Sequence, residues 1–153
     1  MLLGFKRRFA PHVEDGSKTH TIRSKRKVRP KVGETCHCYV DPRQKSMRLL
    51  GRFECVRVQD IEIGALPRSR EIACSDGRHY KGYISIDGVR LSLDECDQFA
   101  WRDGFRPEGT TYERPGKAFA MMFAYWTEER TRNGKHDPLP FHGDVIHWRY
   151  TGR

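Results

Sequence analysis

The sequence has no apolar run that approaches the roughly 20 residues a membrane-spanning helix needs. The first residues, MLLGFKRRF, contain too short an apolar stretch for a signal peptide, so we expect a cytoplasmic protein with no membrane partner. The five cysteines are an odd number without the spacing of a disulfide framework, which predicts reduced thiols. With 37% hydrophobic residues, the 153-residue chain can still form a globular core.

Motifs of common enzymes and metal sites are also missing. The chain has no Gly-rich phosphate loop, no Gly-x-Ser-x-Gly turn and no His-Glu-x-x-His helix. The run Cys36-His37-Cys38 has the wrong spacing for a zinc knuckle, and a strand would place both thiols on one buried face. Three later histidines lack a carboxylate at ligand spacing: His136, His142 and His147. We therefore expect neither a metal nor a cofactor.

Positive charge is present in excess, and it is concentrated. The net charge is +9, and residues 6–57 alone hold 15 Lys and Arg against 5 Asp and Glu. The remaining residues are nearly neutral, with 14 basic and 15 acidic side chains. Such segregation favours a surface that faces a polyanion. A solvated face neutralised by counterions is the alternative, and attraction to a membrane surface is a weaker one.

The pattern of short strands and few helices predicts an α+β fold. Strand-like segments are short and lack regular helices between them, which favours a mixed or antiparallel β-barrel with flanking helices. Two Asp-Gly pairs within residues 64–91 predict an inserted β-hairpin. A capping box of Ser92 and Glu95 predicts a helix that stops at Gly104. Residues 117–134 predict a second, well-buried helix.

One stretch resembles a known family. FKRRFAPHVEDGSKTHTIR, followed by a basic loop and KVGETCHCY, is similar to the ASCH family of the PUA-like superfamily. FAWRDGF resembles the end of a helix in that family, and FHGDVIHW resembles its closing strand. The resemblance covers roughly residues 4–58, 92–105 and 141–149. It implies a single domain over 1–153, with a PUA-like barrel, a cleft for a nucleic acid or nucleoside, and elaborations at 64–91 and 106–140.

The resemblance also implies candidate catalytic residues. Small ASCH members include amidohydrolases that deacetylate N4-acetylcytidine with a Lys, a Thr and an acidic side chain. The matching positions here are Lys18, Thr21 and Asp103. Such a member has Glu where this chain has Asp103, which is one methylene shorter. Other members are thought to bind RNA or DNA, or to cut RNA.

The chemistry of these three residues sets a geometric condition. A Thr hydroxyl becomes a nucleophile when a base such as a Lys of lowered pKa removes its proton, and a carboxylate can orient that Lys. In a regular strand, positions 18 and 21 point to opposite faces, so Lys18 must lie in the turn after Gly16 or a bulge must intervene. In the alternative, the three residues have no catalytic role. Lys18 is then a solvated turn residue, Thr21 is present because it favours a strand, and Asp103 is a charge at the end of a helix.

The nucleic-acid-binding surface predicted from the sequence includes more residues than the three candidate catalytic positions. Cationic side chains of the leading segment would contact phosphates, and Trp101, close to Asp103, would stack on a base, whereas Trp148 is expected to be buried. A mobile loop charged for solubility is the alternative for residues 25–31. The predicted binding residues are Arg7, Arg8, His20, Arg23, Lys25, Arg26, Lys27, Arg29, Lys31 and Trp101.

Three functions remain open from the sequence. The favoured one is a nucleic-acid-binding ASCH domain whose basic cleft recognises a nucleotide or nucleoside, with RNA preferred over DNA. The second is an amidohydrolase acting on N4-acetylcytidine or a related modified nucleoside through Lys18, Thr21 and Asp103. The third is a ribonuclease that uses the same cleft, with His20 taking part. The expected partners are RNA, DNA or a modified nucleoside, and no obligate protein partner is evident.

Overall fold

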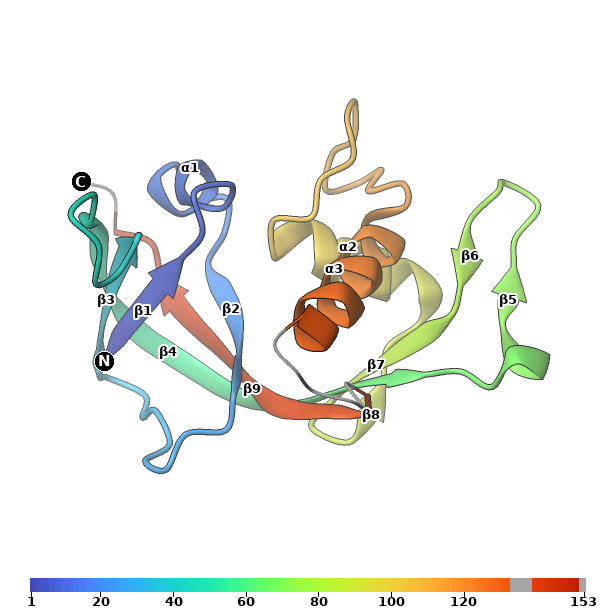
Figure 1. The fold of residues 1–153 in the computed structure, drawn as a ribbon, viewed down its shortest axis with the longest axis horizontal. Coiled ribbons are helices and arrows are strands. Elements are labelled where there is room, and N and C mark those ends of the chain that lie inside the picture. The colour runs from blue at the N-terminus through green and yellow to red at the C-terminus, as the bar shows by residue number, and fades with distance from the viewer. Residues whose placement is uncertain (133–138, 152–153) are drawn as a thin grey trace. The chain divides into compact units, whose positions relative to one another are not determined.

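The computed structural model describes residues 1–132 and 139–151, and it shows an α+β protein built mostly of sheet (Figure 1). The α+β class predicted from sequence is therefore confirmed. By its internal contacts the chain divides into two compact units, Met1–Gln59 with Asp144–Arg153, and Asp60–Gly143. We call them unit 1 and unit 2. None of the helices in the described residues is long and apolar enough to cross a membrane.

Unit 1 is a mixed sheet with one short helix. Its elements are β1 (Leu2–Phe5), α1 (Ala10–Glu14), β2 (His20–Ser24), β3 (Thr35–Val40), the first part of β4 (Arg48–Ala65) and the last part of β9 (Phe141–Arg149). β1 runs parallel to β3, β3 pairs antiparallel with β4, and β9 pairs with both β4 and β2. The order β1-β3-β4-β9-β2 leaves β1 and β2 as edges. No backbone ladder joins these two fully described strands, so a closed barrel stays a prediction.

Alternation along the strands builds the core of unit 1. Cys36, Cys38 and Val40 of β3 are buried, while the residues between them are more exposed. The rings of Phe5 and Phe53 pack on Trp148, with centroids 5.9 and 6.2 Å away. Trp148 is 2% exposed, which confirms its predicted burial.

The connection from α1 into β2 places the predicted Lys-x-x-Thr run. Pro11 lies in the first turn of α1, where its missing N–H costs no helix hydrogen bond. The helix is followed by Gly16, whose φ of 80° is accessible to glycine at little cost. The ring of Tyr150 lies against Gly16, and its hydroxyl donates to the Glu14 carbonyl. Lys18 therefore lies in the turn between Gly16 and β2. This is one of the two arrangements that would let Lys18 and Thr21 act together, the other being a bulge.

Unit 2 contains the two predicted Asp-Gly turns and the two longer helices. Its elements are the rest of β4, η1 (Arg68–Arg70), β5 (Ile72–Ala73), β6 (His79–Tyr80), β7 (Gly82–Ile86), β8 (Val89–Arg90), α2 (Leu93–Arg102), α3 (Ala118–Arg132) and the start of β9. β5 and β6 form a two-stranded hairpin, and β7 pairs with β4 on one side and β8 on the other. Asp87 and Gly88, at φ 50° and 80°, make the two-residue turn between β7 and β8.

The helices of unit 2 follow the sequence signals at their ends. The Ser92 side chain accepts from the Glu95 N–H, and Glu95 accepts from the Ser92 N–H, so the predicted capping box is confirmed.

The prediction that residues 117–134 form a well-buried helix is wrong in part. Ala118, Phe119 and Met122 are buried, but Met121 is 36% exposed, because α3 covers the sheet with one face only. The predicted end at Gly134 lies outside the described residues.

Candidate nucleic-acid interface

A groove of about 900 Å³ runs beside the free edge of β1 in unit 1. It is formed by β1, by the end of β2 with the loop that follows, and by the loop from β3 to β4. Apolar side chains and Gln44 share the lining with four cations and one carboxylate. The lining residues are Leu2, Gly4, Phe5, Lys6, Arg23, Arg26, Asp41, Pro42, Arg43, Gln44 and Met47. The groove therefore has a positively charged and partly apolar lining.

Two arginines from the sequence prediction are anchored on the β1 backbone. Arg23 Nη2 donates to the Gly4 carbonyl, and Arg26 Nη2 donates to the Leu2 carbonyl at 3.1 Å. The Arg23 guanidinium also lies over the Phe5 ring, 5.1 Å from its centroid. Alternate carbonyls of a strand point to the same side, so the two arginines reach the same edge of β1. The Arg23 and Arg26 side chains thus connect the edge strands β1 and β2, which no backbone hydrogen-bond ladder joins in the described residues.

The loop from β3 to β4 supplies the opposite wall. Asp41 accepts hydrogen bonds from Arg7 Nε at 2.8 Å and from the Ser46 hydroxyl at 2.9 Å. These bonds lower the pKa of the Asp41 carboxyl, Arg7 first and Ser46 second. Asp41 and Arg43 both adopt positive φ, at 50° and 66°. The one carboxylate in the groove is therefore already paired, which leaves the cations of its lining in excess.

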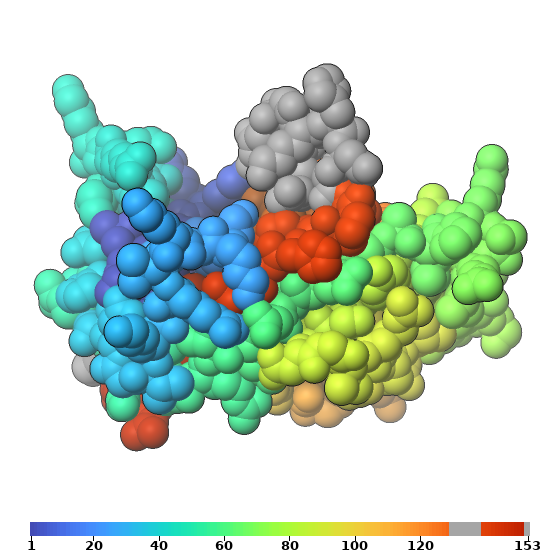
Figure 2. Space-filling model, turned by 90° about the horizontal axis from the view of Figure 1, so that it is seen from below, coloured from blue at the N-terminus to red at the C-terminus, as the bar shows by residue number. Residues whose placement is uncertain are grey.

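Some cations of the basic loop after β2 form ion pairs, and others are exposed. Lys25 Nζ lies 2.7 Å and Arg29 Nη2 lies 3.3 Å from Asp144 Oδ1, and the Asp144 side chain is only 1% exposed. These two cations hold the loop onto β9. Lys27 and Lys31 are exposed, and the loop, coloured light blue, lies at the surface in Figure 2. With Arg26 held on the Leu2 carbonyl, three of the loop's five cations are anchored, so the loop does not present all of them to solvent.

The predicted catalytic pair is buried in unit 1. Lys18 is 2% exposed and Thr21 is 6% exposed. The Lys18 Nζ lies 5.5 Å from the centroid of the Phe9 ring and 6.0 Å from that of Phe5. Its backbone N–H donates to the His12 carbonyl at 2.8 Å. The alternative of a solvated Lys18 is therefore wrong, because the turn folds its side chain inward against two aromatic rings.

His20 lies in the same segment and is buried as well. It is 3% exposed, and its ring centroid lies 5.5 Å from that of His147 on β9. His147 Nε2 is 2.8 Å from the Gln59 side-chain oxygen. His20 therefore does not belong to the exposed cationic surface with which the sequence grouped it.

Two predicted residues belong to unit 2. Asp103 ends α2, is 5% exposed, and donates its backbone N–H to the Phe99 carbonyl. Trp101 is half-buried, and its indole N–H donates to the Thr110 hydroxyl at 3.2 Å. The Arg106 guanidinium lies 3.9 Å from the Trp101 ring centroid, so one face of that ring is already covered.

Two further predicted cations lie in the segment after β1. Arg7 is bound to Asp41, and the Arg8 guanidinium lies 5.0 Å from the Phe9 ring centroid. The sequence prediction missed Lys6 and Arg43, which line the groove. Lys6 directly follows a predicted strand, and Arg43 follows the turn signal Asp41-Pro42, so their positions after strand ends could have identified them.

The cysteine-rich strand β3 buries the thiols of Cys36 and Cys38. Burial raises the pKa of Cys36 and of Cys38 to about 12 in each case. For Cys38 the thiol of Cys36 adds to the rise, and the nearby cations of Arg23 and Lys18 oppose it. Among the described residues, no group of three His, Cys, Asp or Glu side chains is arranged to hold a metal ion.

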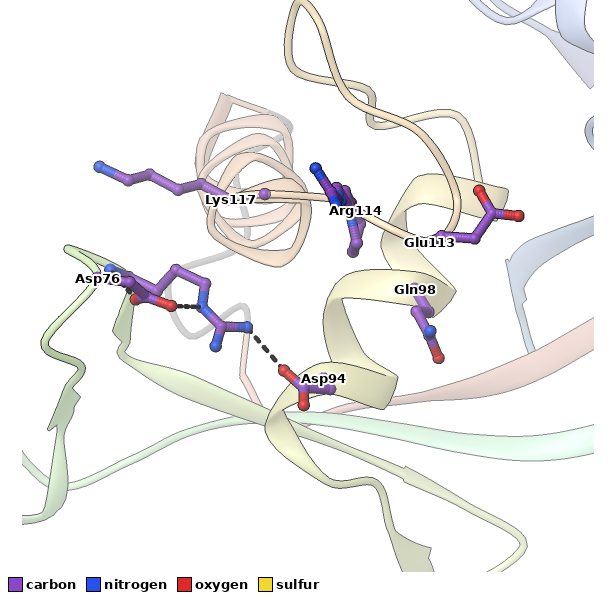
Figure 3. A pocket seen from close by; sticks show the side chains of 9 residues that line it. Asp76, Asp94, Gln98, Glu113, Arg114 and Lys117 are labelled. Atoms are coloured by element: carbon purple, nitrogen blue, oxygen red, sulfur yellow. Dashed lines mark hydrogen bonds and ion pairs between the residues drawn. The ribbon is translucent and has the colours of Figure 1, made fainter.

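Unit 2 has its own polar hollow of about 480 Å³, next to the start of α3. Figure 3 shows Asp94 and Gln98 on α2, and Glu113, Arg114 and Lys117 on the segment that leads into α3. The central cation, Arg78, is bound to Asp76 and Asp94 at 2.8 Å each and to the buried Asp97 at 3.1 Å. Arg78 is thus bound by three carboxylates. Because the described lining of the hollow holds three cations and three carboxylates, it has no excess of either charge.

Scans against protein-family models, curated proteins and solved structures find no match to this chain.

Proposed function

We propose that this protein binds single-stranded nucleic acid, RNA in preference to DNA, through the groove beside β1. The observation that carries the proposal is the composition of the groove: four cations line it, and its one carboxylate, Asp41, is bound by Arg7. Phosphates supply most of the affinity in such a site, because each contact releases condensed counterions. A groove with this surplus of positive charge attracts the backbone of a strand.

The apolar part of the groove lining supports a single strand over a duplex. Leu2 and Met47 line the groove and are 48% and 39% exposed, and the ring of Phe5, also in the lining, lies under the Arg23 guanidinium. Unstacked bases, which only single strands offer, gain by covering apolar surface and cation faces. The Gln44 amide can both donate and accept, which suits a ribose 2′-hydroxyl and is our reason for preferring RNA.

We also propose that the chain is an ASCH domain with a PUA-like barrel. The run from Lys18 to Arg23 enters β2 directly after the helix that is followed by Gly16, the arrangement that the resemblance implies. The order β1-β3-β4-β9-β2 brings the ends of the sheet within reach of Arg23 and Arg26. In this proposal the barrel is completed by those two side chains.

The test is fluorescence anisotropy with a labelled single-stranded RNA and the matching DNA, over a range of salt concentrations. We expect Lys6→Glu and Arg43→Glu each to weaken binding and to reduce the salt slope by about 0.7 per lost phosphate contact. Lys45→Glu is the matched control, because Lys45 is exposed in the same loop as Arg43 but does not line the groove. Equal affinity and equal slope in the groove variants and the control would refute the proposal.

A second candidate, amidohydrolase activity on N4-acetylcytidine, is favoured by one observation. Lys18 and Thr21 are both buried in unit 1, where a structural lysine would ordinarily be solvated. The Thr21 hydroxyl would attack the acetyl carbonyl while a neutral Lys18 accepts its proton. Lys18 would then give that proton to N4 as the C–N bond breaks and cytidine leaves, and water would hydrolyse the acetyl-Thr21 ester to release acetate and restore the hydroxyl. We expect purified protein to release acetate and cytidine, and Lys18→Met or Thr21→Val to abolish this, with Lys27→Met as control. Asp103→Asn tests the acidic residue separately. Absence of acetate at every pH at which the protein stays folded would remove this candidate.

A further inference from the structure

A second hollow in unit 2, of about 430 Å³, lies between α3 and the hairpin of β5 and β6. One wall comes from α3 and the other from residues around β6, and Lys117 stands at the start of α3. The lining residues are Gly77, His79, Lys81, Lys117, Phe119, Ala120, Phe123, Ala124 and Thr127. The volume falls in the lower part of the range of small-ligand sites. Among the described residues no carboxylate lines this hollow, unlike the polar hollow around Arg78.

The α3 wall is held in place by aromatic contacts to β6 and β7. Phe119 stacks on Tyr80 of β6, with ring centroids 6.2 Å apart and planes at 19°. The ring of Phe123 lies on the backbone of Gly82, where a β-carbon would come within 2.3 Å of it. Ala120 and Ala124 are exposed and lie one helical turn apart, so small side chains form the surface between the aromatic rings. Such an apolar wall can accept a planar ring.

Two lysines give the hollow its charge. Lys81 and Lys117 are both exposed and line it. Within the described residues neither ammonium has an acidic partner, whereas Arg78 nearby is bound by three carboxylates. The lining residue His79 lies 3.1 Å from Glu71. The hollow thus combines an apolar wall with two cations, a match for a ligand that joins a planar ring to an anionic group.

We propose that this hollow binds one nucleotide, with its base on the α3 wall at Ala120 and Ala124 and its phosphate between Lys81 and Lys117. The inference goes beyond the proposed function and does not depend on it, because the hollow belongs to unit 2 and the groove to unit 1. An acidic peptide would need a longer groove, whereas a space of about 430 Å³ suits a single ring with its phosphate.

The first experiment is calorimetric titration of the full chain with adenosine and uridine monophosphates. We expect Lys81→Gln and Lys117→Gln each to weaken binding, and Ala124→Trp, which fills the hollow, to weaken it by about tenfold, the scale of one lost base contact. Lys45→Gln, an exposed lysine of unit 1, is the matched control. Circular dichroism and thermal melts establish that each variant is folded. Binding that Ala124→Trp leaves unchanged overturns the proposal, as does inorganic phosphate binding as tightly as the nucleotide.

The second experiment separates this inference from the proposed function. Ala124→Trp and Arg43→Glu are compared for binding of a single-stranded RNA and of free nucleotide. We expect Arg43→Glu to weaken RNA binding and leave the free nucleotide unaffected, and Ala124→Trp to weaken binding of the free nucleotide. If only Arg43→Glu has an effect, the groove of unit 1 stands and the hollow is refuted. If only Ala124→Trp acts, the proposed function fails and the hollow stands. Displacement of the nucleotide by an acidic peptide of higher affinity would overturn the proposed ligand.

Discussion

The Arg23 guanidinium donates a hydrogen bond to the main-chain carbonyl of Gly4 and lies over the ring of Phe5. Through it, a side chain from one edge strand of the unit 1 sheet contacts the backbone of the other edge strand. Arg26 repeats the contact at Leu2. The same two arginines line the groove, so the residues that join the edges also shape the candidate interface.

Removing the Arg23 contact should destabilise the protein more than removing the Arg26 contact. Arg23 is half-buried and covers an aromatic ring, whereas Arg26 is exposed. We expect Arg23→Met to lower the free energy of unfolding by about 1–2 kcal/mol, and Arg26→Met by less than about 0.5 kcal/mol. Urea denaturation of both variants measures the difference. Equal losses would show that Arg23 has no special role in joining the edges.

Lys25 and Arg29 should behave as partial substitutes for each other. Both contact Asp144, which is 1% exposed, so one cation remains when the other is removed. We expect Lys25→Met and Arg29→Met each to cost about 1 kcal/mol and the double variant about 3 kcal/mol, because a buried carboxylate then loses both cations. Lys27→Met serves as the control. Strict additivity in a double-mutant cycle would contradict this account.

Two carboxylates that share Arg78 should differ in their effect on stability. Asp97 accepts from Arg78, from the Tyr80 hydroxyl and from the Phe119 N–H at the start of α3, and it is 1% exposed. The side chain of Asp94 contacts the same arginine but is 80% exposed. We expect Asp97→Asn to cost about 3 kcal/mol and Asp94→Asn less than about 0.5 kcal/mol. Chemical denaturation followed by circular dichroism tests this, and a large loss for Asp94→Asn would refute it.

Stability should fall as the solution becomes alkaline. Burial raises the pKa of the Cys36, Cys38 and Cys96 thiols to about 12 in the folded protein, from an ordinary value of 9.0. Between these values the unfolded chain holds fewer protons than the folded one, so the free energy of unfolding decreases as pH rises from 9.0 towards 12. We expect a decrease of about 1 kcal/mol per thiol for each pH unit above that lower limit.

The urea midpoint measured across this pH range checks the expectation. Cys38→Ala should show a shallower decline than the wild type, while Cys74→Ala, at a half-exposed position, should not differ from it. A decline that is the same in all three proteins would show that the buried thiols do not cause it.

Local signals in the sequence predicted much of the secondary structure. The alternation in TCHCYV gave the buried face of β3, the Ser92–Glu95 pair gave the start of α2, and Asp87-Gly88 gave the turn between β7 and β8. Each of these three features depends on residues that are close together in the chain, so a short stretch of sequence is enough to predict it. The burial of α3 was overestimated, because a helix with apolar residues on most sides does not show which of its faces will find a partner.

The candidate site was predicted less well. The sequence placed Lys25, Arg29 and His20 on one cationic surface, but Asp144 binds the first two and His20 is buried. Asp144 follows these residues by more than a hundred positions, and no local pattern links it to them. Lys6 and Arg43, which line the groove, were missed although their positions directly after a strand and a turn signal could have identified them.

The sequence by itself determined the α+β class, the excess of positive charge in the leading third, and the turns and helix ends that divide the chain. These properties follow from composition and from interactions between near neighbours. Only the tertiary structure decided which cations face a groove and which are bound by carboxylates or carbonyls. It also decided that Lys18 is buried against Phe5 and Phe9. The physical reason is that the surroundings of a charge are set by strands that pair across long sequence separations, and such pairing has no signature in the segment that carries the charge.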